Sequence, residues 1–320
     1  MLIEDMELSL FPLVAGLVLL AVSGEALLRG AVTSALILRV PPLIIGLTII
    51  ALGTSAPELT VSVQAALVGQ TDIAIGNVIG SNIANILLVM GTMAVLSPFV
   101  VSEASVSRDG RFMLLVSALL VGLAYYGVIS LFIGTLLLAV LVIYTVYLYR
   151  SSSDAAHSAE AASSAEENAL PGGLWVAIPA LLIGLVGIVW GADLMVMGAT
   201  QLARDFGISE AVIALSIVAI GTSLPELAVA IIASLRGQAG LAVGNIIGSN
   251  ISNILLILGG TSLVAPLPIV GELAQRDVWV MLGVAVLGVC FMASKRRMSR
   301  LEGAVCVALY VGYIGLIFAV

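Results

Sequence analysis

Charged residues, histidine and cysteine are all scarce in this chain of 320 residues. Aspartate, glutamate, lysine and arginine together make up 10% of it, whereas soluble domains contain about a quarter of charged residues. A packed soluble core therefore does not account for the 61% of hydrophobic residues. Because the apolar runs are continuous rather than alternating, the composition predicts an all-α membrane protein instead of a barrel.

The scarce residues also exclude several functions. His157 is the only histidine and lies in a polar segment, so catalysis by a nucleophile with a histidine base is not expected. Cys290 and Cys306 are too few for a disulfide framework or a zinc site. The net charge of −7, without a basic block away from the helix ends, argues against a nucleic-acid partner. We expect neither enzyme activity, nor a cofactor, nor an obligate protein partner.

Ten apolar runs are long enough to cross a hydrocarbon core of about 30 Å. The acidic residues before the first run are atypical of a cleaved signal peptide, so we expect that run to be retained as a span. A segment rich in serine, alanine and glutamate, 151–172, follows the fifth run and is predicted to be a flexible cytoplasmic linker. The runs lie near 8–30, 41–68, 73–96, 112–128, 130–149, 173–198, 208–235, 240–263, 277–293 and 302–320.

The basic residues predict the orientation of these spans. With an outside N-terminus, ten of the twelve lysines and arginines fall in inside loops, and only Arg204 and Arg276 fall outside. This distribution follows the positive-inside rule. We therefore predict a multi-pass protein of the cytoplasmic membrane with both termini outside.

The two halves, 1–150 and 173–320, repeat one another at an offset of 168 residues. Between 53–91 and 221–259, 24 of 39 positions are identical without a gap. Since each half has five spans, the second copy enters the membrane from the opposite side. The sequence thus predicts ten transmembrane helices in two inverted five-helix repeats, an architecture of secondary transporters whose site lies near the midplane, between broken helices.

The most conspicuous repeated motif is GTSAPEL, which recurs as GTSLPEL. Pro57 lacks an N–H group, so the helix is expected to loosen there and to free carbonyl groups around Ala51. Glu58, Ser55 and Thr54 share one helical face beside them. Carboxylate, hydroxyl and carbonyl oxygens together suit hard cations such as Na⁺ or Ca²⁺.

The other polar residues of the repeats extend this pattern. A membrane-embedded glutamate costs about 3 kcal/mol or more and is usually functional, so we assign Glu58 and Glu226 to a cation site. Asn77 and Asn245 are equally consistent with interhelical packing. The next span of the first copy adds a polar stripe with a spacing of four, made of Asn77, Ser81 and Asn85. The second copy supplies the equivalent residues Ala219, Thr222, Ser223, Asn245, Ser249 and Asn253, so that both copies would surround one polar cage.

At these residues the chain resembles the calcium/cation antiporter superfamily, and within it the prokaryotic-type sodium/calcium exchangers. The signatures GTSAPEL…GNVIGSNIANILLVMG and GTSLPEL…GNIIGSNISNILLILG carry the resemblance, which extends over nearly the whole chain. It implies two long helices, the first and the sixth, that slide against a core of eight. It also implies an ion cage made of Glu58, Glu226, the hydroxyls of Thr54, Ser55, Thr222, Ser223, Ser81 and Ser249, the carbonyls of Ala51 and Ala219, and the side chains of Asn85 and Asn253.

One departure from the family pattern concerns charge. Many members carry an aspartate at one of the two places that Asn85 and Asn253 occupy here. Two glutamates balance one Ca²⁺ or two Na⁺, and a third Na⁺ would add an uncompensated charge in a low dielectric. The sequence predicts Na⁺/Ca²⁺ exchange by alternating access and leaves open proton/calcium exchange, other cation exchange and a passive cation channel.

Overall fold

The computed structural model describes residues 2–103, 105–152, 168–206, 219–271 and 273–319. This part of the chain is mostly helical, and eight of its helices are long and apolar enough to cross a membrane. The prediction of an all-α membrane protein is therefore confirmed. The other two predicted spans correspond to α13 (Leu224–Leu235), of 12 residues, and to α17 (Arg300–Ala319).

The remaining helices follow the order expected from the apolar runs. Most of the predicted linker, and the start of the predicted span 208–235, lie outside the described residues. The first half contains α1 (Leu2–Leu38), α2 (Pro42–Ile45), η1 (Gly46–Ile50), α3 (Ala51–Thr54), α4 (Ala56–Leu67), α5 (Thr71–Ala84), η2 (Asn85–Met90), α6 (Gly91–Leu96), η3 (Ser105–Gly110), α7 (Arg111–Tyr126) and α8 (Leu131–Ser152). The second contains α10 (Leu174–Asp205), α12 (Ala219–Gly221), α14 (Ala239–Ser252), η5 (Asn253–Leu258), α15 (Gly259–Ser262), η6 (Leu273–Asp277) and α16 (Val278–Ala293). Elements η1, η2, η3, η5 and η6 are π-helical turns.

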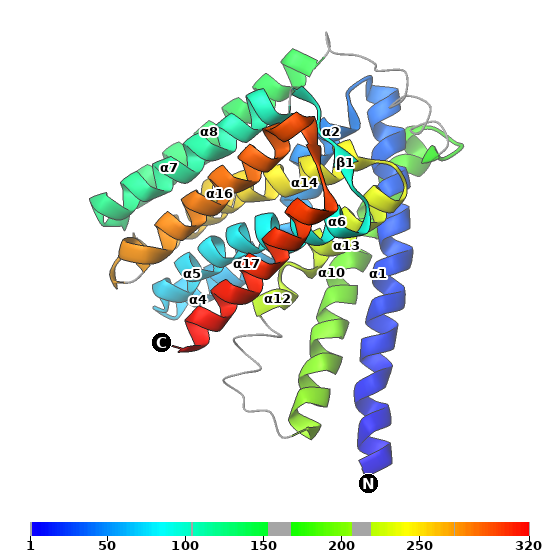
Figure 1. The fold of residues 1–320 in the computed structure, drawn as a ribbon, viewed down its shortest axis with the longest axis horizontal. Helices are drawn as coiled ribbons and strands as arrows, with labels where there is room; N and C mark the ends of the chain where they lie inside the picture. Colours follow the sequence, from blue (N-terminus) through cyan, green and yellow to red (C-terminus); the bar gives the residue numbers. More distant parts are fainter. Residues whose placement is uncertain (1, 104, 153–167, 207–218, 272, 320) are drawn as a thin grey trace.

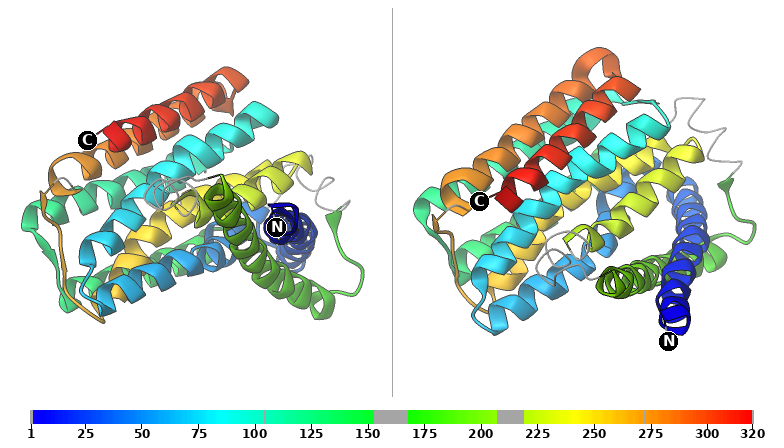
Figure 2. Two further views of the ribbon diagram at one scale, coloured as in Figure 1. Left: turned by 90° about the horizontal axis from the view of Figure 1, so that it is seen from below. Right: turned by 60° about the horizontal axis from the view of Figure 1, so that its bottom comes forward.

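Helices α1 and α10 run alongside one another at the side of the other helices (Figures 1 and 2). Their backbones approach closely because small residues lie at the contact. A Cβ atom added to Gly16 would lie 2.6 Å from the carbonyl oxygen of Gly191. One added to Gly184 would lie 2.7 Å from the carbonyl oxygen of Ser23, the residue equivalent to Gly191 at the 168-residue offset. The close contact is thus made twice, with the roles of the halves exchanged.

Two short antiparallel sheets also join the halves. Strand β1 (Phe99–Val100) pairs with β4 (Arg297–Met298), and β2 (Val128–Ile129) pairs with β3 (Leu267–Pro268). Each sheet therefore combines one strand from each half, at equivalent places in the repeat.

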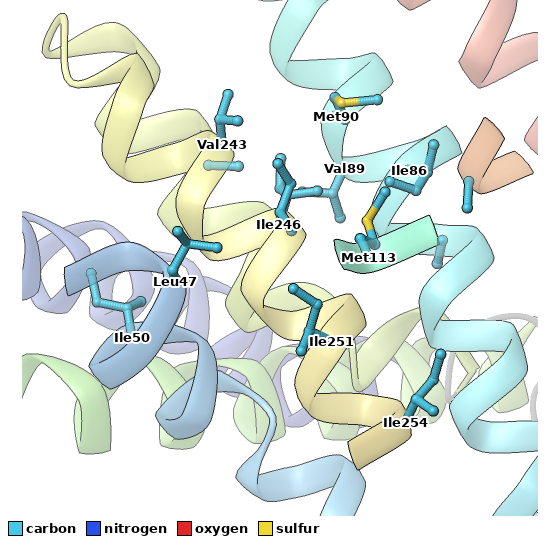
Figure 3. Packing of buried hydrophobic residues seen from close by; sticks show 14 of the residues in the cluster. Leu47, Ile50, Ile86, Val89, Met90, Met113, Val243, Ile246, Ile251 and Ile254 are labelled. Atoms are coloured by element: carbon cyan, nitrogen blue, oxygen red, sulfur yellow. The ribbon is translucent and has the colours of Figure 1, made fainter. Parts of the chain in front are cut away.

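Helix α14 and its continuation lie at the centre of the molecule. In the most apolar 18 residues of the span 239–262, 94% of the residues are buried, against 72% in those of the span 71–96 in the first half. Figure 3 shows residues of α14 and η5 between side chains of η1, such as Leu47 and Ile50, and side chains of η2, such as Ile86 and Val89. Polar residues on α14 are consequently placed in the interior, where they need partners from other helices.

Candidate ion-binding site

The two proline motifs interrupt their helices where the sequence predicts. Helix α3 ends at Thr54, Ser55 has φ −81° and ψ 4°, and Pro57 lies in the first turn of α4. In the second copy Ser223 has φ −89° and ψ 2°, and Pro225 lies in the first turn of α13. Each break therefore places a serine directly before a new helix. Proline is favoured in the first turn of that helix, because a backbone N–H in the first turn has no carbonyl partner within the helix.

The carbonyl groups at the two breaks differ from the expectation. The backbone N–H of Ser55 donates to Ala51 O at 3.1 Å, and the Thr54 hydroxyl approaches the same oxygen at 3.5 Å. Ala51 O is therefore partnered rather than free, and only its second lone pair is left for a cation. In the second copy Ser223 N–H donates to Ile220 O at 3.0 Å, one residue past Ala219, which opens α12.

Glu58 and Glu226 are both buried, each with only 1% of the residue exposed. Each lies in the first turn of the helix that follows a break, where the helix dipole favours a negative charge. Two such groups in one interior call for a compensating positive charge.

A chain of polar contacts joins Glu226 to the first half. The hydroxyl of Ser249 donates to Oε1 of Glu226 at 3.4 Å, and it lies 3.4 Å from Oγ1 of Thr54. Thr54 in turn donates to Oδ1 of Asn245 at 3.3 Å. These distances exceed the 2.7–2.8 Å typical of hydroxyl hydrogen bonds. The oxygens are therefore close together, but the hydrogen bonds between them are weak.

Many atoms of the predicted cage, and one atom of Asn245 beside it, are buried without a hydrogen-bond partner in the part of the chain that the structure describes. An unsatisfied buried polar group costs about 1–3 kcal/mol, so a cluster of them calls for something that binds oxygen. The atoms are Ser55 Oγ, Glu58 Oε2, both polar atoms of Asn85, Ser223 Oγ, Glu226 Oε2, Asn245 Nδ2 and Asn253 Oδ1. Most of them are oxygens of the kind that hard cations prefer.

The remaining predicted residues lie on the same elements. Ser81 is buried on α5, and Thr222, which makes a contact of its own, is partly buried at the second break. Asn85 and Asn253 are the first residues of the π-helical turns η2 and η5. Helix α4 packs against η5, and α13 packs against η2. Each glutamate helix thus faces the asparagine turn of the other half.

Some polar features escaped the sequence reasoning. The π-helical turns have no local signature, although π-helices are frequent at functional sites. The pair Arg108–Asp109 recurs as Arg276–Asp277 at the 168-residue offset. A comparison of the charged residues in the two halves would have identified this pair from the sequence. Arg108 Nε donates to Asp109 Oδ1 at 2.6 Å and Tyr144 donates to the same oxygen at 3.1 Å, so the buried carboxylate of Asp109 already has hydrogen-bond donors.

Glu25 also takes part in ion pairs. Its carboxylate accepts hydrogen bonds from Arg29 at 2.7 Å and from Arg236 at 3.0 Å. The pair with Arg236 connects α1 to the residue that follows α13. Asp193, the residue equivalent to Glu25 in the second half, is exposed on α10. Neither carboxylate belongs to the cluster around Glu58 and Glu226.

The chain is similar to several known proteins over almost its whole length. The family model described as "Sodium/calcium exchanger protein" matches residues 8–150 and 176–319. CaxA of Alkalimonas amylolytica is 41% identical over 95% of this chain and 97% of its own length. The inner membrane protein YrbG of Escherichia coli is 40% identical over 86% of each chain. A solved structure of the sodium-calcium exchanger NCX_Mj has a TM-score of 0.83 and 32% identity, and the match covers 97% of this chain and 99% of that one.

Proposed function

Because the chain belongs to the sodium/calcium exchanger family, within the calcium/cation antiporter superfamily, we propose that it exchanges Na⁺ for Ca²⁺ at one shared cage. The family makes it a multi-pass membrane transporter of the cation/Ca²⁺ antiport type rather than an enzyme. The ions are its substrates. The cage consists of Glu58, Glu226, Thr54, Ser55, Thr222, Ser223, Ser81, Ser249, Asn85 and Asn253, with the carbonyls of Ala51 and Ala219.

The observation that carries this proposal is the pair of buried glutamates surrounded by unpartnered oxygens. Each of Glu58 and Glu226 has a carboxylate oxygen without a hydrogen-bond partner among the described residues. One Ca²⁺ or two Na⁺ would balance two carboxylates, whereas an empty site with two like charges is costly in an interior. The protein therefore crosses between its two states with ions bound, and competition for the same ligands couples the two fluxes.

The architecture that we propose for this exchange is an inverted repeat of two five-helix halves, 1–150 and 173–320, joined by a cytoplasmic linker at 151–172. The exchanged contacts of Gly16 and Gly184 and the two sheets that combine the halves support it. Both termini would lie outside. Helices α1 and α10, which lie beside the other helices (Figure 1), would slide to expose the cage to one side at a time.

The test is Ca²⁺ uptake into proteoliposomes loaded with Na⁺. We expect uptake to require internal Na⁺ and to disappear in Glu58→Gln, which keeps the size of the side chain and removes its charge. Glu103→Gln is the matched control, because Glu103 is exposed and forms an ion pair only with exposed Arg296 among the described residues. A potential imposed with K⁺ and valinomycin then reports whether more than two Na⁺ move per Ca²⁺.

Other outcomes identify other transport modes. Uptake driven by a pH gradient without Na⁺ would show that protons are the coupling ion. Two protons can neutralise the two glutamates, and the asparagines at 85 and 253 add no further charge to the cage. Flux without any counter-ion would indicate a passive channel. Substantial uptake in Glu58→Gln would reject the shared cage.

A further inference from the structure

We propose that Asn82 is a positioning residue that turns the carbonyl oxygen of Asn253 toward the ion cage. The inference rests on the proposed function, since Asn253 is one ligand of the proposed cage. Asn82 lies on α5 of the first half, and Asn253 opens η5 of the second; both are buried. The amide nitrogen of Asn253 donates to Oδ1 of Asn82 at 3.0 Å. One amide therefore crosses the boundary between the halves to hold another.

Asn82 is held at its other end by Met281 on α16. Its amide nitrogen donates to the Met281 sulfur at 3.6 Å. A thioether sulfur accepts hydrogen bonds weakly and has no hydrogen to donate, so the nitrogen end of Asn82 faces Met281. The carbonyl end is then left for Asn253. Because that carbonyl only accepts, the nitrogen end of Asn253 has to face it.

This sequence of contacts decides which atom Asn253 presents to the cage. Its Oδ1 is buried and has no hydrogen-bond partner in the described part of the chain. Hard cations bind carbonyl oxygens and are repelled by amide hydrogens. The turn η5 packs against α4, the helix that carries Glu58. Asn82 thus orients a neutral oxygen ligand toward the carboxylate without touching the ion.

The equivalent residues of the other half are bonded differently. Asn250, equivalent to Asn82, donates to the backbone oxygen of Ile246 in its own helix at 2.8 Å. Asn85, equivalent to Asn253, has neither polar atom partnered within the described residues. The orientation of Asn85 is therefore left to the bound ion, whereas that of Asn253 is set beforehand. This difference provides a control within the same molecule.

The test is calorimetric Ca²⁺ binding to the purified full chain without Na⁺. We expect Asn82→Ala to raise the Kd for Ca²⁺ about tenfold, the effect of one lost hydrogen bond. When Asn253 is already alanine, Asn82→Ala should raise the Kd for Ca²⁺ by less than about twofold more, because Asn82 acts only through Asn253. Asn250→Ala, the matched control, should change the Kd by less than about twofold. Additive losses in the double variant, or an equal loss in Asn250→Ala, would overturn the inference.

A second variant keeps the test decisive if Asn82→Ala does not fold. Asn82→Asp retains an acceptor oxygen at the same place, so it should bind Ca²⁺ at least as tightly as the wild type. Weaker binding in Asn82→Asp would refute the positioning role. Na⁺-driven Ca²⁺ uptake is measured in parallel with binding. If Ca²⁺ binding depends on Asn82 but Na⁺ drives no uptake, the role of Asn82 is supported and sodium coupling is refuted. A wild type that binds no Ca²⁺ would overturn both.

Discussion

Asn77 and Asn245 occupy equivalent positions in the two halves, but their side chains have different partners. The amide nitrogen of Asn77 donates to the backbone oxygen of Glu58 at 3.1 Å and to the hydroxyl of Ser62 at 3.0 Å. The carbonyl oxygen of Asn245 instead accepts a hydrogen bond from Thr54, across the boundary between the halves. One asparagine supports its own repeat, and the other takes part in the candidate site.

One substitution between the repeats removes a partner that Asn77 has and Asn245 lacks. The residue equivalent to Ser62 is Ala230, so the second half offers no hydroxyl to the amide of Asn245. Asn245 is also fully buried, whereas Asn77 is only partly buried. Ser62 thus holds the amide nitrogen of Asn77 within its own half, whereas the amide nitrogen of Asn245 has no hydrogen-bond partner among the described residues. Duplicated motifs give candidate ligands, and their neighbours decide which ones reach the ion.

The largest expected effect tests a feature that the two halves share, the buried glutamate. Glu58→Gln and Glu226→Gln should each lower Na⁺-dependent Ca²⁺ uptake more than about 100-fold, because each leaves one charge to face a divalent ion. The measurement is initial uptake in proteoliposomes, with Glu103→Gln as control. If one of the two variants kept near-normal uptake, the cage would belong to a single half.

The next prediction separates the two asparagines. Asn245→Ala should raise the KM for Ca²⁺ about tenfold, since it removes the partner of Thr54 beside the carboxylates. Asn77→Ala should leave KM within about twofold and lower the melting temperature, because Ser62 and the carbonyl of Glu58 lose their partner. Uptake kinetics and thermal unfolding in detergent measure the two quantities. A reversed pattern would show that the contacts of Asn77, not those of Asn245, matter for the ion.

The sequence predicted the parts of the site that depend on local chemistry. Pro57 and Pro225 interrupt their helices because a proline lacks an N–H group wherever it lies. The π-helical turns that begin at Asn85 and Asn253 were not predicted, since an extra residue in a helical turn depends on packing against neighbouring helices. The partners of Asn82 and Asn77 could not be read either, because their motif is repeated with the same residues in both halves. The same residue in the two halves can therefore have different hydrogen-bond partners, and the motif alone does not show which.

Another substitution makes the second half resemble the first. Ala230→Ser introduces the hydroxyl that Ser62 provides to Asn77. It offers the unpartnered Nδ2 of Asn245 an acceptor, and the turn of the side chain toward that acceptor should lengthen the contact between Asn245 Oδ1 and Thr54. We expect the KM for Ca²⁺ to rise about threefold, less than in Asn245→Ala, because the asparagine is redirected and not removed. The same uptake assay measures it. Ala230→Val, which adds volume without a hydroxyl, is the control, and an equal rise there would attribute the effect to crowding.

The smallest expected effect concerns an ion pair that only one half possesses. Arg236 donates to Glu25 on α1 at 3.0 Å, whereas the residue equivalent to Arg236 is Val68. The arginine side chain is 49% exposed and that of Glu25 is 25% exposed, and exposed pairs contribute about 0–1 kcal/mol. Arg236→Gln should therefore change Ca²⁺ uptake by less than about threefold, and the difference from wild type should shrink at high salt. A loss as large as that of Glu58→Gln would mean that this contact controls the movement of α1, which the geometry of an exposed pair does not support.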